Sequence, residues 1–195
     1  MSRDSSATRA RILDCTWNLL ESGDKKVRMA DVAKAVGVSR QALYLHFPTR
    51  AELLIATTRH IDSVKNVDAR LAESRAATSG RERLEAFISA WGGYIPEIHG
   101  VSVALRSMYD NDAEAEEAWN DRMQAVRHGC VAAVAALASD KMLRPDLNVE
   151  VATDLLWTLL SVENWERLVR DCGWSQAEYE RHIKRLSEAA LLAKD

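Results

Sequence analysis

Residues 28–47 read RMADVAKAVGVSRQALYLHF, and two short helical patterns meet there at a single glycine. The first pattern has apolar residues at helical spacing, namely Met29, Val32, Ala33 and Val36. Gly37 gives the backbone the freedom to end that helix, and Ser39 can cap the start of the next one. Two helices joined by so short a turn form the sequence pattern of a helix-turn-helix.

The second helix of such a motif is the one that meets DNA. Leu43 and Phe47 lie four residues apart and can anchor this helix inward. That arrangement leaves polar and aromatic residues on or beside the outward surface, namely Arg40, Gln41, Tyr44 and His46. Their side chains suit base edges and phosphates, so the sequence predicts a DNA-binding surface here.

Further motifs flank this segment on both sides. An apolar helical stripe precedes it in ARILDCTWNLLESG (residues 10–23), and a basic residue with an acidic-leucine pair follows it at Arg50, Glu52 and Leu53. The segment itself adds the Val32–Ala33 pair, the GVS of residues 37–39 and the LYLHF of residues 43–47. With these motifs at these spacings, the stretch from Thr8 to Thr57 resembles the N-terminal DNA-binding domain of the tetracycline-repressor (TetR) family of bacterial transcription regulators. Two positions depart from the family pattern: Arg28 stands near a usual threonine, and Gln41 replaces a common glycine.

Individual roles follow from the chemistry of base edges. We expect Arg40 to donate to guanine, Gln41 to donate to adenine, and Leu45 to meet a thymine methyl group. Phosphates would be held by side chains around these three. The alternatives are that Leu45 packs against the first helix and that His46 caps or stacks locally. The whole predicted set is Arg28, Ser39, Arg40, Gln41, Tyr44, Leu45, His46, Thr49 and Arg50.

Three arginines at helix starts support the same conclusion independently. Arg28, Arg40 and Arg50 lie at or just inside three helix N-termini, where the helix macrodipole is positive and disfavours a cation by about 0.3–1 kcal/mol. An anion opposite each of them would remove this cost. DNA phosphate is the anion we expect, whereas the alternative is that the arginines are merely solvated.

Charge and composition separate two parts of the chain. Residues 1–50 hold 9 Lys and Arg against 5 Asp and Glu, a balance of +4, so residues 51–195 carry −7 of the total of −3. A basic N-terminal quarter on an acidic body keeps the attraction for phosphate local. With few glycines and prolines and 47% hydrophobic residues, the sequence predicts an all-α protein.

Helix boundaries divide the chain into a helix-turn-helix domain at 1–49 and a helical ligand-binding and dimerisation domain at 50–195. A helix from 50 to about 77 is expected to connect them, because Thr49 and Glu52 form a capping box. Pro96 should end the helix that begins after Ser79, and a short helix should follow at about 102–109. We expect the next helix at about 113–138 and the final one after Ser175.

The last two helices are the expected dimer interface. The run DLLWTLLSV (residues 154–162) is apolar on more than one face, and the final helix repeats apolar residues at the spacing of a bundle seam. The alternative is an intramolecular core. The resemblance implies a two-fold dimer through a four-helix bundle, and hence a palindromic operator. The predicted interface is Leu155, Leu159, Val162, Tyr179, Ile183, Leu186 and Ala190.

The resemblance also implies a small-molecule effector that releases a repressor from its operator. Aromatic and methionine side chains are the candidate pocket walls, although ordinary core packing is the alternative for each of them. They are Phe87, Trp91, Tyr94, Met108, Tyr109, Trp119, Met123, Trp157 and Trp165. An effector would act by spreading the two recognition helices away from one helical turn of spacing.

Other protein classes have little support in the sequence. We find no phosphate-binding glycine loop, nucleophile elbow or metal-ligand spacing, so an enzyme, a cofactor or a metal is not expected. The sequence also has no apolar run long enough to span a membrane, and its first residues do not resemble a signal peptide, which favours a cytoplasmic protein. The three cysteines are expected to be buried or half-buried thiols. A DNA-binding protein without an effector, either a constitutive repressor or an architectural factor, is the alternative function.

Overall fold

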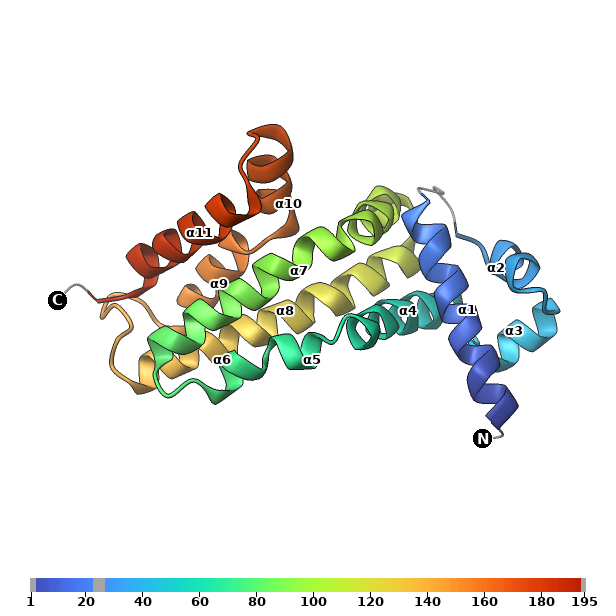
Figure 1. Cartoon of the computed structure of the whole chain (residues 1–195), viewed down its shortest axis with the longest axis horizontal. Helices are drawn as coiled ribbons and strands as arrows, with labels where there is room; N and C mark the ends of the chain where they lie inside the picture. Colours follow the sequence, from blue (N-terminus) through green and yellow to red (C-terminus); the bar gives the residue numbers. More distant parts are fainter. Residues whose placement is uncertain (1–2, 23–26, 194–195) are drawn as a thin grey trace. The chain divides into compact units, whose positions relative to one another are not determined.

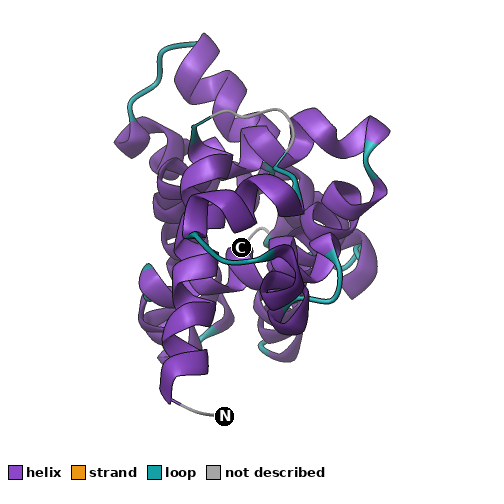
Figure 2. Ribbon diagram, turned by 90° about the vertical axis from the view of Figure 1, so that its right-hand side faces the viewer, coloured by secondary structure: helices purple, strands orange, loops and turns teal. Residues whose placement is uncertain are grey.

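The structure is a computed structural model that describes residues 3–22 and 27–193 (Figure 1). Within these ranges the regular elements are helices, joined by loops, with an isolated antiparallel bridge between Leu143 and Leu192 (Figure 2). The predicted all-α fold class is therefore confirmed. None of the helices in these ranges is both long enough and apolar enough to cross a bilayer.

The chain divides into two compact units. The first comprises Met1–Lys65 and Ile98–Met123, and the second comprises Asn66–Glu97 and Gln124–Asp195. The two units are defined by how compactly their residues pack and not by function. The predicted boundary between a DNA-binding domain ending at residue 49 and a ligand-binding domain starting at residue 50 therefore stays a prediction.

The first unit contains the helix-turn-helix and its supports. Its helices are α1 (Arg3–Glu21), α2 (Met29–Val36), α3 (Arg40–His46) and α4 (Arg50–Val64). It also contains the end of α7 (Gly80–Met108), the 3-10 turn η1 (Tyr109–Asn111) and the start of α8 (Ala113–Ser139). Between α2 and α3, Gly37 adopts a left-handed φ of 76°, which a residue with a side chain rarely takes. The Ser39 hydroxyl then accepts a hydrogen bond from the Ala42 N–H at 3.1 Å. The predicted turn is therefore present, with the predicted cap.

Burial of the inner faces holds these short helices together. The helix α1 packs against both α2 and α4. The buried side chains come from all four helices and include Ile12, Leu20, Val32, Leu43, Phe47, Leu53 and Leu54. Arg11 adds a hydrogen bond from its guanidinium to the Val36 carbonyl at 2.9 Å, at the end of α2 where a cation is favoured.

The predicted connecting helix at 50–77 is wrong in one respect, because it is not continuous. It consists of α4, α5 (Val67–Arg70) and α6 (Ala72–Ala76). The break occurs at Asn66, which has a left-handed φ of 54°. Asparagine tolerates this conformation better than most residues, since its short polar side chain interacts with the local backbone. A pattern of good helix formers around a single asparagine gave no warning of the break.

The prediction that Pro96 ends a helix is also wrong. The helix α7 runs from Gly80 to Met108 with Pro96 inside it. A proline lacks the N–H that would bond the carbonyl four residues earlier, here that of Gly92. In this fold the side-chain Nε2 of Gln176 donates to the Gly92 carbonyl at 2.9 Å. A residue 84 positions away thus satisfies the acceptor that the proline leaves, so the helix continues.

The second unit is built from long helices and a C-terminal pair. It contains most of α7, the C-terminal part of α8 (Ala113–Ser139), α9 (Val149–Leu159), α10 (Val162–Trp165), the π-helix η2 (Glu166–Asp171) and α11 (Gln176–Leu191). The helices expected after Ser79 and after Ser175 are both present, and each begins with a capping box. Hydrogen bonds from Ser175 hold the pKa of the Glu178 carboxyl below its usual range.

Burial separates the predicted dimer residues into two groups. Val162, Tyr179 and Ile183 are at most 1% exposed within the single chain, so they belong to the subunit core, as the alternative interpretation held. Their inward position follows from α11 packing against both α9 and η2. Leu155 and Leu186 are 40% and 50% exposed, and Leu159 and Ala190 are half-buried.

The cysteines follow the expectation at two positions. Cys130 is buried, which raises the pKa of its thiol to about 12, and Cys15 is half-buried. Cys172 is exposed, contrary to the prediction, because it follows the last turn of η2 just before the left-handed Gly173.

Two polar groups of α11 give a paired stability prediction. The Gln176 amide accepts from Trp165 Nε1 at 2.9 Å as well as donating to Gly92, whereas the buried Tyr179 hydroxyl has no hydrogen-bond partner among the described residues. We expect Gln176→Leu to lower the free energy of unfolding by about 1–3 kcal/mol, because the Gly92 carbonyl loses its donor. Tyr179→Phe should leave the free energy unchanged or raise it. Urea unfolding of both variants measures this, and a larger loss for Tyr179→Phe would contradict it.

Candidate nucleic-acid interface

The recognition helix α3 has one buried face and one exposed face. Leu43 and Phe47 are 0% and 1% exposed, so they hold the helix against the core of the first unit. Tyr44 is 49% exposed and Leu45 is 82% exposed, the largest value among the exposed bulky apolar side chains described. Leu45 therefore does not pack against α1, which removes the structural alternative for that residue. The exposed side chain is accessible to a thymine methyl group, as the predicted contact requires.

Arg40 and Gln41 extend the same surface at the start of α3. Both side chains are exposed. Arg28, the N-cap residue of α2, is exposed as well and makes no side-chain capping bond. Among the described residues, neither Arg28 nor Arg40 has an ion-pair partner. Two of the three arginines at helix starts thus remain available to an external anion.

Ser39 and Thr49 have capping roles of their own. Ser39 accepts from the Ala42 N–H, and Thr49 accepts from the Glu52 N–H at 3.1 Å. Both side chains are exposed. A hydroxyl can accept and donate at the same time, so capping leaves the Ser39 proton available to a phosphate.

His46 lies at the end of α3 and is half-buried. Its backbone carbonyl accepts a hydrogen bond from Arg9 Nη1 at 3.1 Å, and the Arg9 guanidinium lies 4.2 Å from the centroid of the Phe47 ring. Arg9 therefore stabilises the C-terminal end of α3, where the macrodipole favours a cation. The ring of His46 is the least exposed of the predicted side chains on this helix.

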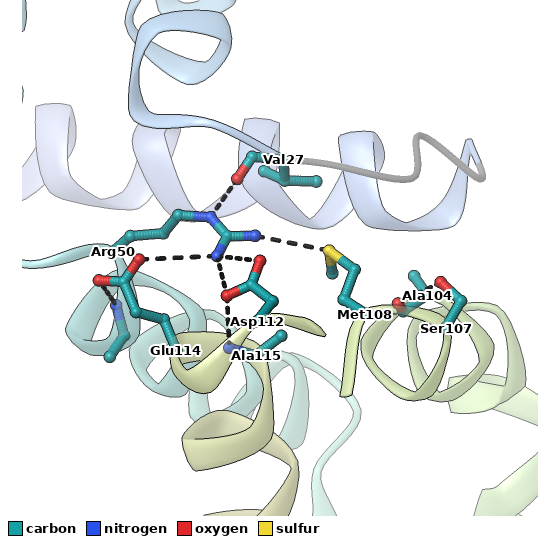
Figure 3. Close-up of polar contacts among 9 residues, drawn as sticks. Val27, Arg50, Ala104, Ser107, Met108, Asp112, Glu114 and Ala115 are labelled. Carbon is teal, nitrogen blue, oxygen red and sulfur yellow. Dashed lines mark hydrogen bonds and ion pairs between the residues drawn. The ribbon is translucent and has the colours of Figure 1, made fainter. Parts of the chain in front are cut away.

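Arg50 differs from the other predicted DNA contacts. Its side chain is only 11% exposed, and its Nη1 lies 2.9 and 2.8 Å from the two carboxylate oxygens of Asp112 (Figure 3). Nη1 also lies 3.6 Å from Glu114, while Nη2 donates to the Met108 sulfur at 3.5 Å and Nε donates to the Val27 carbonyl. Within the protein the Arg50 guanidinium is therefore occupied, because two carboxylates of its own chain supply an anion, and the phosphate contact at Arg50 stays a prediction.

The starts of α4 and α8 stabilise each other at this point. Glu114 Oε1 accepts from the Ala51 N–H at 3.2 Å, so an acidic residue of α8 caps α4. Asp112 Oδ1 accepts from the Ala115 N–H at 3.2 Å and so caps its own helix. Both carboxylates lie at helix N-termini, where negative charge is favoured. The sequence predicted a helix from about 113 here, but no sequence signal linked its acidic start to Arg50.

A groove of about 1010 Å³ opens beside these residues, entirely within the first unit. Side chains of the predicted DNA set form part of its lining, and the Arg50 ion pair forms another part. The lining residues are Arg28, Met29, Ala30, Arg40, Tyr44, Pro48, Thr49, Arg50, Ser107, Met108, Asn111, Asp112 and Glu114. Met108 is the only predicted effector residue among them.

The predicted effector residues divide between the two units. Met108, Tyr109, Trp119 and Met123 lie in the first, and Phe87, Trp91, Tyr94, Trp157 and Trp165 lie in the second. Several have core roles: Phe87 closely contacts the backbone at Gly129, and Trp91 Nε1 donates to the Leu160 carbonyl at 2.7 Å. Trp91 and Tyr94 form an edge-to-face pair with ring centroids 6.1 Å apart.

Solved structures share this fold over nearly the whole chain. A regulator FadR from Bacillus subtilis in complex with stearoyl-CoA has a TM-score of 0.73 at 14% identity, covering 92% of this chain and 97% of that one. A candidate regulator from Saccharomonospora viridis in complex with choline has a TM-score of 0.72 at 21% identity, covering 97% and 100%. NalD from Pseudomonas aeruginosa, the secondary repressor of a multidrug efflux pump, has a TM-score of 0.68 at 20% identity, covering 98% and 99%. At these identities the likeness concerns the fold.

Sequence comparison shows which family the N-terminal part of the chain matches. The HTH-type transcriptional activator FasR from Mycolicibacterium smegmatis is 29% identical over 121 residues, which are 62% of this chain. The aligned part spans about half of that relative, 53% of its length. Residues 12–57, which include α2, α3 and their buried anchors, match the family model of bacterial regulatory proteins, tetR family. Residues 12–57 of this chain therefore form a domain of the TetR family.

Proposed function

We propose that this protein is a sequence-specific DNA-binding regulator of transcription. The observation that carries the proposal is the two-faced helix α3, in which Leu43 and Phe47 are buried while Arg40, Gln41 and Leu45 project into solvent. A hydrogen-bonding arginine, an amide and an apolar side chain on one exposed helix face together provide the chemistry of direct readout in a major groove.

The remaining exposed residues around α3 suit the phosphate backbone. Among the described residues the Arg28 guanidinium has no ion-pair partner, and Tyr44 and Thr49 present hydroxyl groups along the same groove lining. Phosphate contacts of this kind position a protein on the duplex without reading its sequence. Ser39 and His46 have local structural roles as well, so we assign them a smaller share of the affinity.

A second copy of the chain is the proposed partner. Leu155 of α9 and Leu186 of α11 are exposed apolar side chains on helices that pack together, and Leu159 and Ala190 border them. Buried surface between two such pairs of helices would form a four-helix bundle with two-fold symmetry. A two-fold dimer would place its two recognition helices on a palindromic operator.

The effector is part of the proposal too. The relatives that share this fold are complexed with chemically different ligands, choline and stearoyl-CoA, which supports a ligand-binding body without indicating the ligand of this chain. FasR is named an activator and NalD a repressor. The position of the operator determines whether a regulator activates or represses transcription. We propose a repressor that its effector releases. A DNA-binding protein without an effector is the second candidate, and the match of residues 12–57 to the tetR family model supports either over an enzyme.

The first prediction concerns selection of DNA. From a random pool at about 150 mM salt, the purified protein should enrich a palindrome, and the Arg40→Ala, Gln41→Ala double variant should not. Arg40→Ala alone should lose about 1–3 kcal/mol of discrimination at one base position in each half-site. The measurement is sequencing of the bound fragments, followed by titration of single-base variants of the operator.

Two arginines serve as controls for that selection. Arg28→Ala should weaken binding to all sequences alike and reduce the salt dependence by about one phosphate per half-site. Arg185→Ala, at an exposed position of α11, should enrich the same palindrome as the wild type. Equal, weak binding of the wild type and the double variant would contradict a recognition role for α3.

The second prediction concerns the dimer. Leu155→Glu combined with Leu186→Glu should halve the mass measured by light scattering, because each dimer would otherwise bury unpaired carboxylates. Val64→Glu is the matched control, since Val64 is 49% exposed but lies at the end of α4 in the other unit. A double variant that keeps the mass of a wild-type dimer would show that these leucines lie outside the interface.

The third prediction tests the effector by thermal unfolding. A panel that includes choline and a long-chain acyl-CoA should contain a compound that raises Tm by about 5–10 °C at roughly 100 times its Kd. That compound should also weaken operator binding, with the usual coupling of about 5- to 150-fold. A compound that raises Tm and leaves operator affinity unchanged would contradict release by that effector.

A further inference from the structure

Arg50 joins three separate segments of the first unit through one guanidinium. Nε donates to the Val27 carbonyl before α2, Nη1 donates to the Asp112 carboxylate at the start of α8, and Nη2 donates to the Met108 sulfur at the end of α7 (Figure 3). The planar fork of arginine can satisfy acceptors in different directions at once, which a lysine ammonium on its flexible stem does less well.

The Val27 carbonyl belongs to the peptide group that leads directly into Arg28. Val27 is 2% exposed, and its peptide plane includes the nitrogen of Arg28. The Arg28 carbonyl in turn accepts from the Asp31 and Val32 N–H groups at 3.0 and 3.1 Å, and so begins α2. Holding the Val27 carbonyl therefore fixes the orientation of the peptide from which the exposed Arg28 side chain departs.

Asp112 is itself held in place. Its Oδ1 caps α8 through the Ala115 N–H, and its side chain is 25% exposed. Glu114 on the same helix caps α4 through the Ala51 N–H. The anchor for Arg50 is thus a carboxylate built into a helix N-terminus, and not a mobile surface acid.

We propose that Arg50 is a positioning residue for operator binding, which acts through Arg28 and depends on its ion pair with Asp112. This inference rests on the proposed function, because it assumes that Arg28 contacts operator phosphate. The competing role for Arg50 is a direct phosphate contact, which would require the guanidinium to leave Asp112 and Glu114. Their two carboxylates would then be unneutralised near the DNA and would repel it.

Asp112→Asn separates the two roles by the sign of its effect. Asparagine is as good an N-cap as aspartate, so α8 keeps its cap while the charge is lost. If Arg50 positions Arg28, the variant should bind the selected palindromic duplex about 3- to 30-fold more weakly. If Arg50 contacts phosphate, freeing it and removing a nearby negative charge should strengthen binding and steepen the salt dependence. Stronger binding by Asp112→Asn would overturn the inference.

A double-mutant cycle tests whether the effect passes through Arg28. Arg28→Ala and Asp112→Asn should be non-additive, since the second change cannot misplace a side chain that is already absent. Additive losses would mean that Asp112 stabilises the fold without positioning Arg28. Arg50→Lys provides a second variant: it should lose affinity as Asp112→Asn does, whereas a simple phosphate contact would tolerate lysine.

Asp121→Asn is the matched control. Asp121 pairs with Arg59 at 2.7 Å, also between α8 and α4, but the Arg59 side chain is 65% exposed. An exposed pair of this kind contributes little, so operator affinity should stay within about twofold. A wild-type protein that binds no duplex would reject the proposed function itself. A wild type that binds, with Asp112→Asn and Arg50→Lys equal to it, would reject only the positioning role.

Discussion

The recognition helix depends on two buried side chains. Seven residues are too few for an isolated helix to be stable in water, because nucleation is costly and few hydrogen bonds follow it. Leu43 and Phe47 remove this difficulty by burying the inner face of α3, which packs against α2. Their burial also fixes the rotation of the helix, so that Arg40, Gln41 and Leu45 face solvent together. The stability of the domain and its reading surface therefore have the same cause.

Electrostatics at helix starts then distinguishes residues that look alike in the sequence. Arg28, Arg40 and Arg50 all occupy positions where the macrodipole disfavours a cation, and each is expected to face an anion. For Arg50 that anion is the carboxylate pair of Asp112 and Glu114. Arg28 and Arg40 have no such partner in the described part of the chain, so a phosphate remains the natural partner for them. The same physical argument thus predicts an anion for every arginine, and only for Arg50 does the protein itself supply it.

The second unit shows how a tertiary contact can reverse a local rule. Pro96 should end a helix, and α7 continues because Gln176 donates to the Gly92 carbonyl in place of the missing N–H. The same contact brings α11 close to α7, where Gly92 has no side chain and a Cβ would lie 3.3 Å from the Tyr179 ring. Tyr179 thereby lies in the core of the subunit, whereas Leu155 and Leu186 stay exposed.

Short-range patterns were sufficient for the helix-turn-helix, its Gly37 turn, its Ser39 cap and the capping boxes at Ser79 and Ser175, because each depends on residues three or four positions apart. The all-α class and the outward face of α3 follow from the same periodicity. The partner of Arg50 lies 62 residues away, and the donor that lets α7 pass Pro96 lies 84 residues from Gly92. Which candidate interface residues are buried was decided in the same way, since packing of α11 on α9 and η2 determines it. A local pattern contains no information about such distant neighbours, so the folded chain alone could decide whether each arginine, carbonyl and apolar side chain is satisfied inside the protein or remains available outside it.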